Sequence, residues 1–534
     1  MAFAFNSATE QQLSLWDSYE ALTPREKRAL EKSWAKVFAE KIFPRINEAP
    51  YSVLYSDVAS RPNTPVNVII GALILKEFTG QSDDDFNTSL MFDIRYQYAL
   101  HTTSFIEQPL SDRTLGRFRE RCITYEKETG IDLLHDTIIS LSEEMAAMMK
   151  VDRSLKRMDS LMVASNIKRM SRLELLYTCT ANLVNACKKN GETIPEQLQH
   201  YLSSEDRNLV IYHNKSDETQ DKITTILNDA KVLVALCGGR YDEFSEYQLM
   251  IRVLSEQAVL QEDGTYILRQ KGEGMKAEGL QNPSDPDATY REKAGKKHRG
   301  YVANVVEESG DNGSVITDYQ YEQNTHSDSE FAKETIESLG KQDTPVTLVA
   351  DGAYSGQENE KLAKDNNINL ETTNLTGKET PDINADFQFN EDGTRVTACP
   401  NGQEPKSCSY NPKTGQCTVS FHRCQCEGCP YADNCKRKVY KRTVRITTSL
   451  NSKNRAMQQR NRKTDEFKAL SHFRNGVETV PSLLRRLFDV DHMPVRGKLR
   501  TKLFFGCKIG GLNFLKLCKY EQRLVKCAQI PASA

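Results

Sequence analysis

The chain has 534 residues, of which 38% are hydrophobic and 27% charged, a composition typical of a globular protein of several domains and not of a fibrous or disordered one. No apolar run approaches the roughly 20 residues that a membrane span needs. The N-terminal MAFAFNSATEQQ lacks the basic start and apolar stretch of a signal peptide. We therefore expect a cytoplasmic protein without a membrane partner.

Charge is distributed unevenly along the chain. From Lys436 to the end there are 24 Lys and Arg against six Asp and Glu, so these 99 residues carry +18, whereas the whole chain carries −2 and the remainder −20. A segment this basic favours a polyanion partner. The alternative is a solvated basic surface, or cations paired with acids elsewhere in the chain. The candidates for phosphate contact are Arg496, Lys498, Arg500 and Lys502.

Residues 10–150 are predicted to be mostly helical. The segment 65–80 is apolar at helical spacing and is closed by Gly80. A basic helix is expected to open at Ser111 with an N-cap-like start, and an amphipathic helix is expected over 132–150. We assign residues 1–150 to a helical N-terminal domain.

The pattern changes after residue 154. A candidate strand carrying Asp159 comes first, and residues 170–262 return to helical spacing. The stretch 263–297 is rich in Gly, Asp, Pro and Lys, which predicts a long exposed loop. A helical insertion and a loop therefore interrupt the domain that begins near residue 151.

Strand signals resume after the loop. The turn residues 309–313 lie between two alternating segments and predict a hairpin. An apolar strand over 346–350 stops at Asp351, and a short helix and a further strand follow it. The order indicates a mixed α/β core over 151–378 and 440–534.

Three acids stand out by their positions. Asp351 follows a buried strand, where ligands bind in open α/β sheets, Asp159 lies in the first strand, and Glu478 lies on a helix expected to begin near Ser471. Arg474 and Arg485 share roughly one face of that helix with Glu478. Three such carboxylates can hold two divalent cations about 4 Å apart for phosphoryl transfer. Taken singly, an Asp at a strand end is more often a turn or cap residue, and Arg474 with Glu478 also fits an ordinary helix salt bridge.

Seven of the fourteen cysteines lie within 399–435. Because the reducing compartment expected for this chain disfavours disulfides, this density favours metal binding. Four of them suit a tetrahedral structural zinc site: Cys399, Cys426, Cys429 and Cys435. Three further cysteines are spare candidates: Cys408, Cys417 and Cys424. Free thiols are the alternative. We assign 379–439 to a small Cys-rich, zinc-ribbon-like insertion.

Several motifs together resemble the DDE transposases of bacterial insertion sequences, whose catalytic domain has an RNase H-like fold. They are PVNVIIGALILKEFTG, FDIRYQYAL, LSDRTLGRFRERC, RMDSLMVASNI, DPDAT, KKHRGYVANVV, YEQNTHSD, VADGAYSG, FRNGVETVPSLLRR and DHMPVRGKLRTKLFFGCKIGGLNFLKL. The resemblance implies that Asp159, Asp351 and Glu478 are the catalytic, metal-binding acids.

The family signature around the glutamate is Tyr-x2-Arg-x3-Glu-x6-Lys. Arg474 and Glu478 fit it, whereas Ser471 stands in place of the Tyr and Arg485 in place of the Lys. An arginine can still contact phosphate, and can do so bidentately. The resemblance implies that Arg474 and Arg485 contact DNA.

By resemblance, the chain is a metal-dependent transposase that cuts DNA at the terminal inverted repeats of its element and joins the ends to target DNA. It would use two Mg²⁺ or Mn²⁺ ions per site, carry a structural Zn²⁺, and act as a dimer or larger assembly on DNA near the bacterial nucleoid. The alternatives are an RNase H-like nuclease without strand transfer, and a non-catalytic nucleic-acid-binding protein derived from a transposase.

Overall fold

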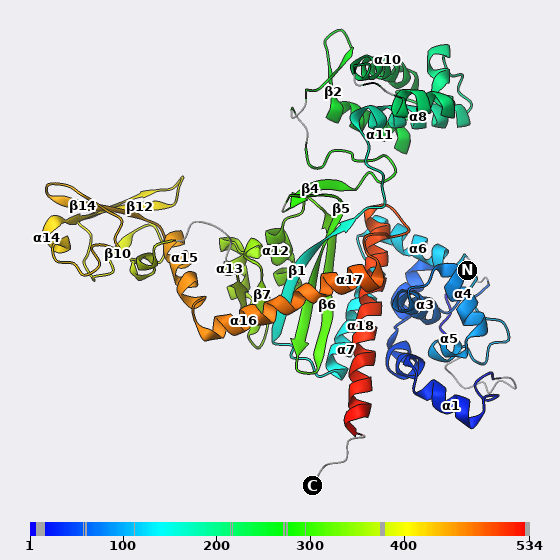
Figure 1. Cartoon of the computed structure of the whole chain (residues 1–534), viewed down its shortest axis with the longest axis horizontal. Coiled ribbons are helices and arrows are strands. Elements are labelled where there is room, and N and C mark those ends of the chain that lie inside the picture. Colours follow the sequence, from blue (N-terminus) through cyan, green and yellow to red (C-terminus); the bar gives the residue numbers. More distant parts are fainter. Residues whose placement is uncertain are drawn as a thin grey trace. The chain divides into compact units, whose positions relative to one another are not determined.

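The computed structural model describes residues 1–6, 17–56, 58, 61–111, 113–213, 215, 217–270, 273, 276–293, 295–373 and 380–528 (Figure 1). The chain divides into two compact units. Unit 1 comprises residues 1–335 and 478–534, and unit 2 comprises residues 336–477. Helices and strands are mixed in the fold, as the sequence predicts. None of the helices in these described ranges is long and apolar enough to cross a membrane.

The N-terminal part of unit 1 is helical, as predicted. Its helices are α1 (Pro24–Glu31), α2 (Trp34–Val37), α3 (Val66–Thr79), α4 (Asp83–Phe92), α5 (Ile94–Ala99), α6 (Thr114–Thr129) and α7 (Leu133–Met148). Gly80 ends α3 in a left-handed conformation with φ of 68°. The predicted start of α6 at Ser111 is wrong, because the helix begins at Thr114 after Arg113. The Ser111 hydroxyl instead bonds the Thr114 hydroxyl at 2.8 Å.

Four antiparallel strands form the second part of unit 1. They are β1 (Leu155–Ala164), β4 (Thr289–Lys293), β5 (Lys296–Gly310) and β6 (Gly313–Gln323). β5 pairs with β1, β4 and β6, and Asp159 of β1 lies opposite Val305 of β5. The predicted hairpin is confirmed as β5 and β6, joined through Asp311 and Asn312. α12 (Asp328–Leu339) follows the sheet.

α18 (Lys498–Ala528) runs through the core of unit 1 and contacts α3, α7 and β6 (Figure 1). Its glycines permit this close packing. A Cβ at Gly506 would clash with the hydroxyl of Tyr319, and one at Gly511 would lie 3.0 Å from the backbone nitrogen of Phe78. α17 (Thr479–Phe488) precedes α18 and also packs against it.

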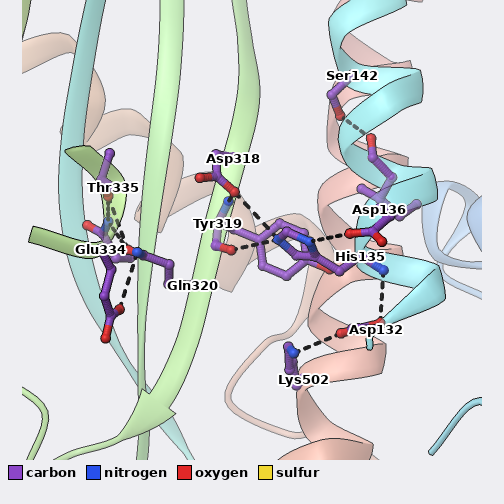
Figure 2. A network of polar contacts seen from close by, with 12 residues as sticks. Asp132, His135, Asp136, Ser142, Asp318, Tyr319, Gln320, Glu334, Thr335 and Lys502 are labelled. Carbon is purple, nitrogen blue, oxygen red and sulfur yellow. Dashed lines mark hydrogen bonds and ion pairs between the residues drawn. The ribbon is translucent and has the colours of Figure 1, made fainter. Parts of the chain in front are cut away.

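A polar network ties α7 to β6 in unit 1 (Figure 2). One ring nitrogen of His135 lies 3.0 Å from the carbonyl oxygen of Tyr319 and 3.5 Å from a carboxylate oxygen of Asp318. Near the start of α7, Lys502 of α18 binds Asp132 at 2.8 Å. Burial disfavours the charged imidazole, but the Asp318 carboxylate outweighs burial and raises the pKa of His135.

The helical insertion of unit 1 has a core of its own, built largely from α8, α10 and α11. Its elements are α8 (Arg172–Lys189), α9 (Ser204–Arg207), α10 (Thr219–Cys237), α11 (Ser245–Gln257), β2 (Ala258–Leu260) and β3 (Tyr266–Leu268). The prediction of one exposed loop over 263–297 is wrong, because β3, β4 and the start of β5 lie within it. Asp285 in this stretch is fully buried and accepts a hydrogen bond from the Tyr301 hydroxyl at 2.6 Å.

Unit 2 begins with a parallel pair of strands, β7 (Val346–Ala350) and β8 (Ile368–Thr372), joined by α13 (Gln357–Asp365), as the sequence predicts. The Cys-rich segment contains β9 (Gln388–Phe389), β10 (Val396–Ala398), β11 (Ser407–Asn411), β12 (Gln416–His422), α14 (Arg423–Cys426), β13 (Arg437–Val439) and β14 (Thr443–Thr448). Its four-stranded sheet has the order β11-β12-β14-β13. β14 continues this sheet beyond residue 439.

The predicted helix around the third acid is interrupted. It begins not near Ser471 but at Asp465, as α16 (Asp465–Asn475), which follows α15 (Leu450–Asn461) in unit 2. A 3-10 turn over Gly476–Glu478 then separates α16 from α17. Arg474 therefore lies in the last turn of one helix, while Glu478 immediately precedes the next. No continuous helix joins Arg474, Glu478 and Arg485, as the shared helical face had required.

Candidate active site

Asp159 lies in the middle of β1 in unit 1. Its side chain is half-buried, and its Oδ1 accepts a hydrogen bond from the backbone N–H of Ser160 at 3.0 Å. The flanking residues Met158 and Leu161 are buried in the core. The buried neighbours of Asp159 therefore hold the backbone that carries its carboxylate in place.

Glu478 is exposed at the start of α17 in unit 1. Two turns further along that helix, Arg485 donates to the carbonyl oxygen of Met162 at 2.9 Å and to Asp491 at 3.1 Å. Asp491 in turn accepts from the backbone N–H of Ala164 at 3.1 Å. Arg485 and Asp491 thus attach the helix that follows Glu478 to the strand that carries Asp159.

Asp351 caps the 3-10 turn Gly352–Tyr354 at the carboxyl end of β7 in unit 2. Its Oδ1 accepts from the backbone N–H of Gly352 at 2.5 Å and from the Thr373 hydroxyl at 3.1 Å. Its Oδ2 lies 3.9 Å from a guanidinium nitrogen of Arg474, and the side chain is 48% exposed. One carboxylate oxygen is held while the other faces a cation at the edge of the parallel strands.

The environment of Asp351 includes contacts that sequence reasoning missed. Arg474 was placed beside Glu478 by helical spacing, whereas its 13%-exposed side chain lies within ion-pair distance of Asp351. Thr373 was not singled out. The signal available for Thr373 was its position directly after a strand that neighbours the Asp351 strand, since the carboxyl ends of parallel strands share one edge.

The four cations of residues 496–502 that were assigned to phosphate contact all have partners within unit 1. Lys498 binds Glu322 at 2.5 Å, and Arg496 donates to the carbonyl oxygen of Asn166 at 2.6 Å. Arg500 binds Glu120 at 3.1 Å, and Lys502 binds Glu126 and Asp132 at 2.8 Å each. Burial opposes the charge of Lys502, yet Asp132 and Glu126 raise its pKa. Three of these cations are therefore paired with acids, which is the alternative to DNA contact given above. Each of these ion pairs must open before its cation can bind phosphate.

The cysteines of 399–435 fall into two groups. Burial and the charges of Cys429, Cys399 and Cys426 raise the pKa of Cys435 to about 11. Burial and Cys408 raise the pKa of Cys417 to about 11, and the Cys417 thiol donates to the carbonyl oxygen of Thr394 at 3.3 Å. The group around Cys435 contains the four cysteines selected as zinc ligands. Thirteen of the fourteen cysteines have side chains that the structure describes, and these thirteen are free thiols.

The described residues contain no group of three or more His, Cys, Asp or Glu side chains placed to hold a metal ion. By chemistry, the carboxylates suit hard divalent cations and the thiols suit zinc. Asp351 is partly exposed, and Cys399, Cys426 and Cys435 pack against the same small core.

Residues 398–518 match a family model described as "Transposase DDE domain". The matched region includes Arg474, Glu478 and Arg485, whereas Asp159 and Asp351 lie before it. This match indicates a transposase DDE domain, although it covers less than half of the chain.

A solved structure described as "Cryo-EM structure of piggyBac transposase synaptic complex with hairpin DNA (SNHP)" matches with 12% identity and a TM-score of 0.23, over 78% of this chain and 77% of that chain. A likeness at that TM-score is too slight to support an inference about fold or function. Comparison with curated proteins gives no match.

Proposed function

We propose that the protein is a DDE-type transposase of a bacterial insertion sequence, which cuts DNA at the terminal inverted repeats and joins the 3′ ends to target DNA. The observation that carries the proposal is the setting of Asp351. The residue ends a buried parallel strand, Gly352 and Thr373 hold its Oδ1, and Oδ2 faces Arg474. The transposase DDE match of residues 398–518 supports the same class.

In this proposal Asp159, Asp351 and Glu478 are the acids that hold Mg²⁺ or Mn²⁺, two ions per site. Bound divalent cations would polarise the attacking oxygen and stabilise the leaving oxygen of an in-line displacement. The chain's own residues do the positioning: Gly352 and Thr373 fix the Asp351 carboxylate, and Arg474 supplies a cation beside it for a phosphate oxygen. Pairing two element ends favours a dimer or a larger assembly on DNA.

The Asp351→Asn variant tests the catalytic assignment. The change keeps the size of the side chain and removes its charge, so cleavage and strand transfer should fall at least about 100-fold, as expected when a principal electrostatic contribution is lost. Binding to the element ends should change little. Both activities are measured with Mg²⁺ on DNA that flanks the gene, and Asp159→Asn and Glu478→Gln should behave alike.

Asp343→Asn is the matched control, because Asp343 is an exposed acid of the same unit and lies outside the site. It should cleave at the wild-type rate. Wild-type rates from Asp351→Asn would remove this residue from the catalytic site. Cleavage by the wild-type chain without any joining of 3′ ends would instead establish the nuclease alternative.

Zinc binding by Cys399, Cys426, Cys429 and Cys435 is a second part of the proposal. It is supported by the packing of Cys399, Cys426 and Cys435 against one small core and by the spacing of Cys426 and Cys429. Freshly purified, reduced protein should contain about one zinc per chain, and Cys429→Ser should lose it and unfold the Cys-rich module at lower temperature, since structural zinc contributes on the order of 10 kcal/mol to folding such modules. Cys408→Ser is the control that should retain the metal. Metal-free wild-type protein would establish the free-thiol alternative.

A further inference from the structure

The Cys-rich module carries an unusually basic strand pair. β13 is one of the two edge strands of its four-stranded sheet and pairs with β14. We call residues 436–448 the basic hairpin. Six cations and no acids lie between its first residue and Arg445: Lys436, Arg437, Lys438, Lys441, Arg442 and Arg445. All of these except Arg437 are exposed.

These cations lack the carboxylate partners that the cations of α18 have. Among the described residues, no ion pair within 4.0 Å joins any of the six to an Asp or Glu. Arg437 donates to the carbonyl oxygen of Cys426 at 3.0 Å, and the Arg445 guanidinium lies 5.3 Å from the centre of the Tyr440 ring. By contrast, Lys498, Arg500 and Lys502 each bind a carboxylate. The basic hairpin is therefore available to a polyanion without first losing an internal ion pair.

The strand register sets two of these cations against each other. Lys438 of β13 lies directly opposite Arg445 of β14, and Ser420 of β12 lies on the other side of Arg445. Directly opposed residues share one face of a sheet, and like charges in that arrangement are destabilising. Val444 and Ile446 point to the buried side of β14, which confirms that Arg445 faces solvent. A row of anions over this face would relieve the repulsion.

We propose that the basic hairpin binds the phosphate backbone of duplex DNA. The choice of DNA among polyanions rests on the proposed function. The evidence for a polyanion site, which is the absence of ion pairs and the opposed cations, is independent of that function. A two-stranded ribbon can follow a DNA groove or its rim, and phosphate contacts of this kind position a protein without reading sequence. Tyr440, which is 47% exposed, lies under Arg445 and restricts its guanidinium.

The test is the salt dependence of DNA binding by the full chain carrying Lys438→Gln and Arg445→Gln. Binding is measured without divalent metal, so that no catalytic step contributes. The result can therefore be interpreted even if the catalytic proposal is wrong. Each lost phosphate contact should reduce the slope of log K against log salt by about 0.9, so the double variant should lose about 1.8. The loss should be equal on element ends and on unrelated duplexes.

The control variant carries Lys188→Gln and Lys189→Gln, which remove the same charge from exposed positions in the last turn of α8 and should leave the slope unchanged. Lys438→Glu adds a second check. It should place a cross-strand carboxylate beside Arg445, so the module should melt at a higher temperature while DNA binding weakens further.

An unchanged slope in the hairpin double variant, with the module still folded, would overturn the proposal. Increased self-association with an unchanged slope would show that the cations only protect an edge strand from pairing with other chains. Loss of binding to RNA but not to duplex DNA would likewise overturn it and assign the hairpin to another polyanion.

Discussion

His135 shows how one side chain can link folding to pH. Its imidazole lies between α7 and β6, against the Tyr319 carbonyl and the Asp318 carboxylate (Figure 2). Although burial alone would lower its pKa, the acid neighbours Asp318 and Asp132 raise it. The folded protein therefore binds a proton more tightly at this position than the unfolded chain does.

Because the folded pKa is raised, the contribution of His135 to stability is fully present below the unfolded pKa of about 6.5 and is lost as pH rises through the folded pKa. The His135→Asn variant should therefore lower the free energy of unfolding more at about pH 5.5 than at about pH 8.5. Urea unfolding at the two pH values measures the difference. His213→Asn, at an exposed histidine of the helical insertion, is the control. An equal loss at both pH values would show that the ring acts by packing alone.

Buried charges join the elements of unit 1. Glu307 of β5 is fully buried and binds Lys516 of α18 at 2.5 Å and Arg157 of β1 at 2.7 Å. Burial alone would raise the pKa of Glu307, but the charges of Lys516 and Arg157 outweigh it and the pKa is lowered. One carboxylate thus links a helix and two strands, and its removal would leave two cations without their counter-ion.

The Glu307→Gln variant should lower the free energy of unfolding by about 3–5 kcal/mol, because breaking a buried pair leaves uncompensated charge. Glu322→Gln is the matched control. It breaks the partly exposed pair with Lys498 and should cost about 0–1 kcal/mol. Chemical denaturation at neutral pH compares the two. Equal small losses would mean that water or rearrangement neutralises Lys516 and Arg157.

At the scale of the whole molecule, the sequence predicted elements better than contacts. The apolar helix α3 and the buried strand β7 were predicted because their residues carry a strong periodicity or a continuous apolar run. β3 was missed, because it is three residues long and lies in a segment dominated by turn residues. Asp285 was assigned to an exposed loop, although it accepts from Tyr301 and from the backbone N–H of Gly497.

The candidate site was predictable only in part, for a physical reason. Asp351 and Cys435 could be selected because a strand end and a cysteine spacing are local features. The pair of Arg500 and Glu120 joins residues 380 positions apart, a distance over which local spacing carries no information. The same holds for Arg485 and the Met162 carbonyl, 323 positions apart. Ion pairs between residues far apart in the sequence determine which cations have a partner. These pairs can be identified only from the folded structure.

The packing of α18 against α3 has a consequence during translation. Lys508 neutralises the buried Glu77 at 2.7 Å across 431 positions of the chain. A ribosome adds about 5–20 residues per second, so Lys508 is synthesised on the order of 20 to 90 s after Glu77. Through that interval the side of α3 that packs against α18 lacks its partner, whereas α4 and α6 are made soon after α3. Slower translation therefore lengthens the period in which this apolar side is exposed to other chains.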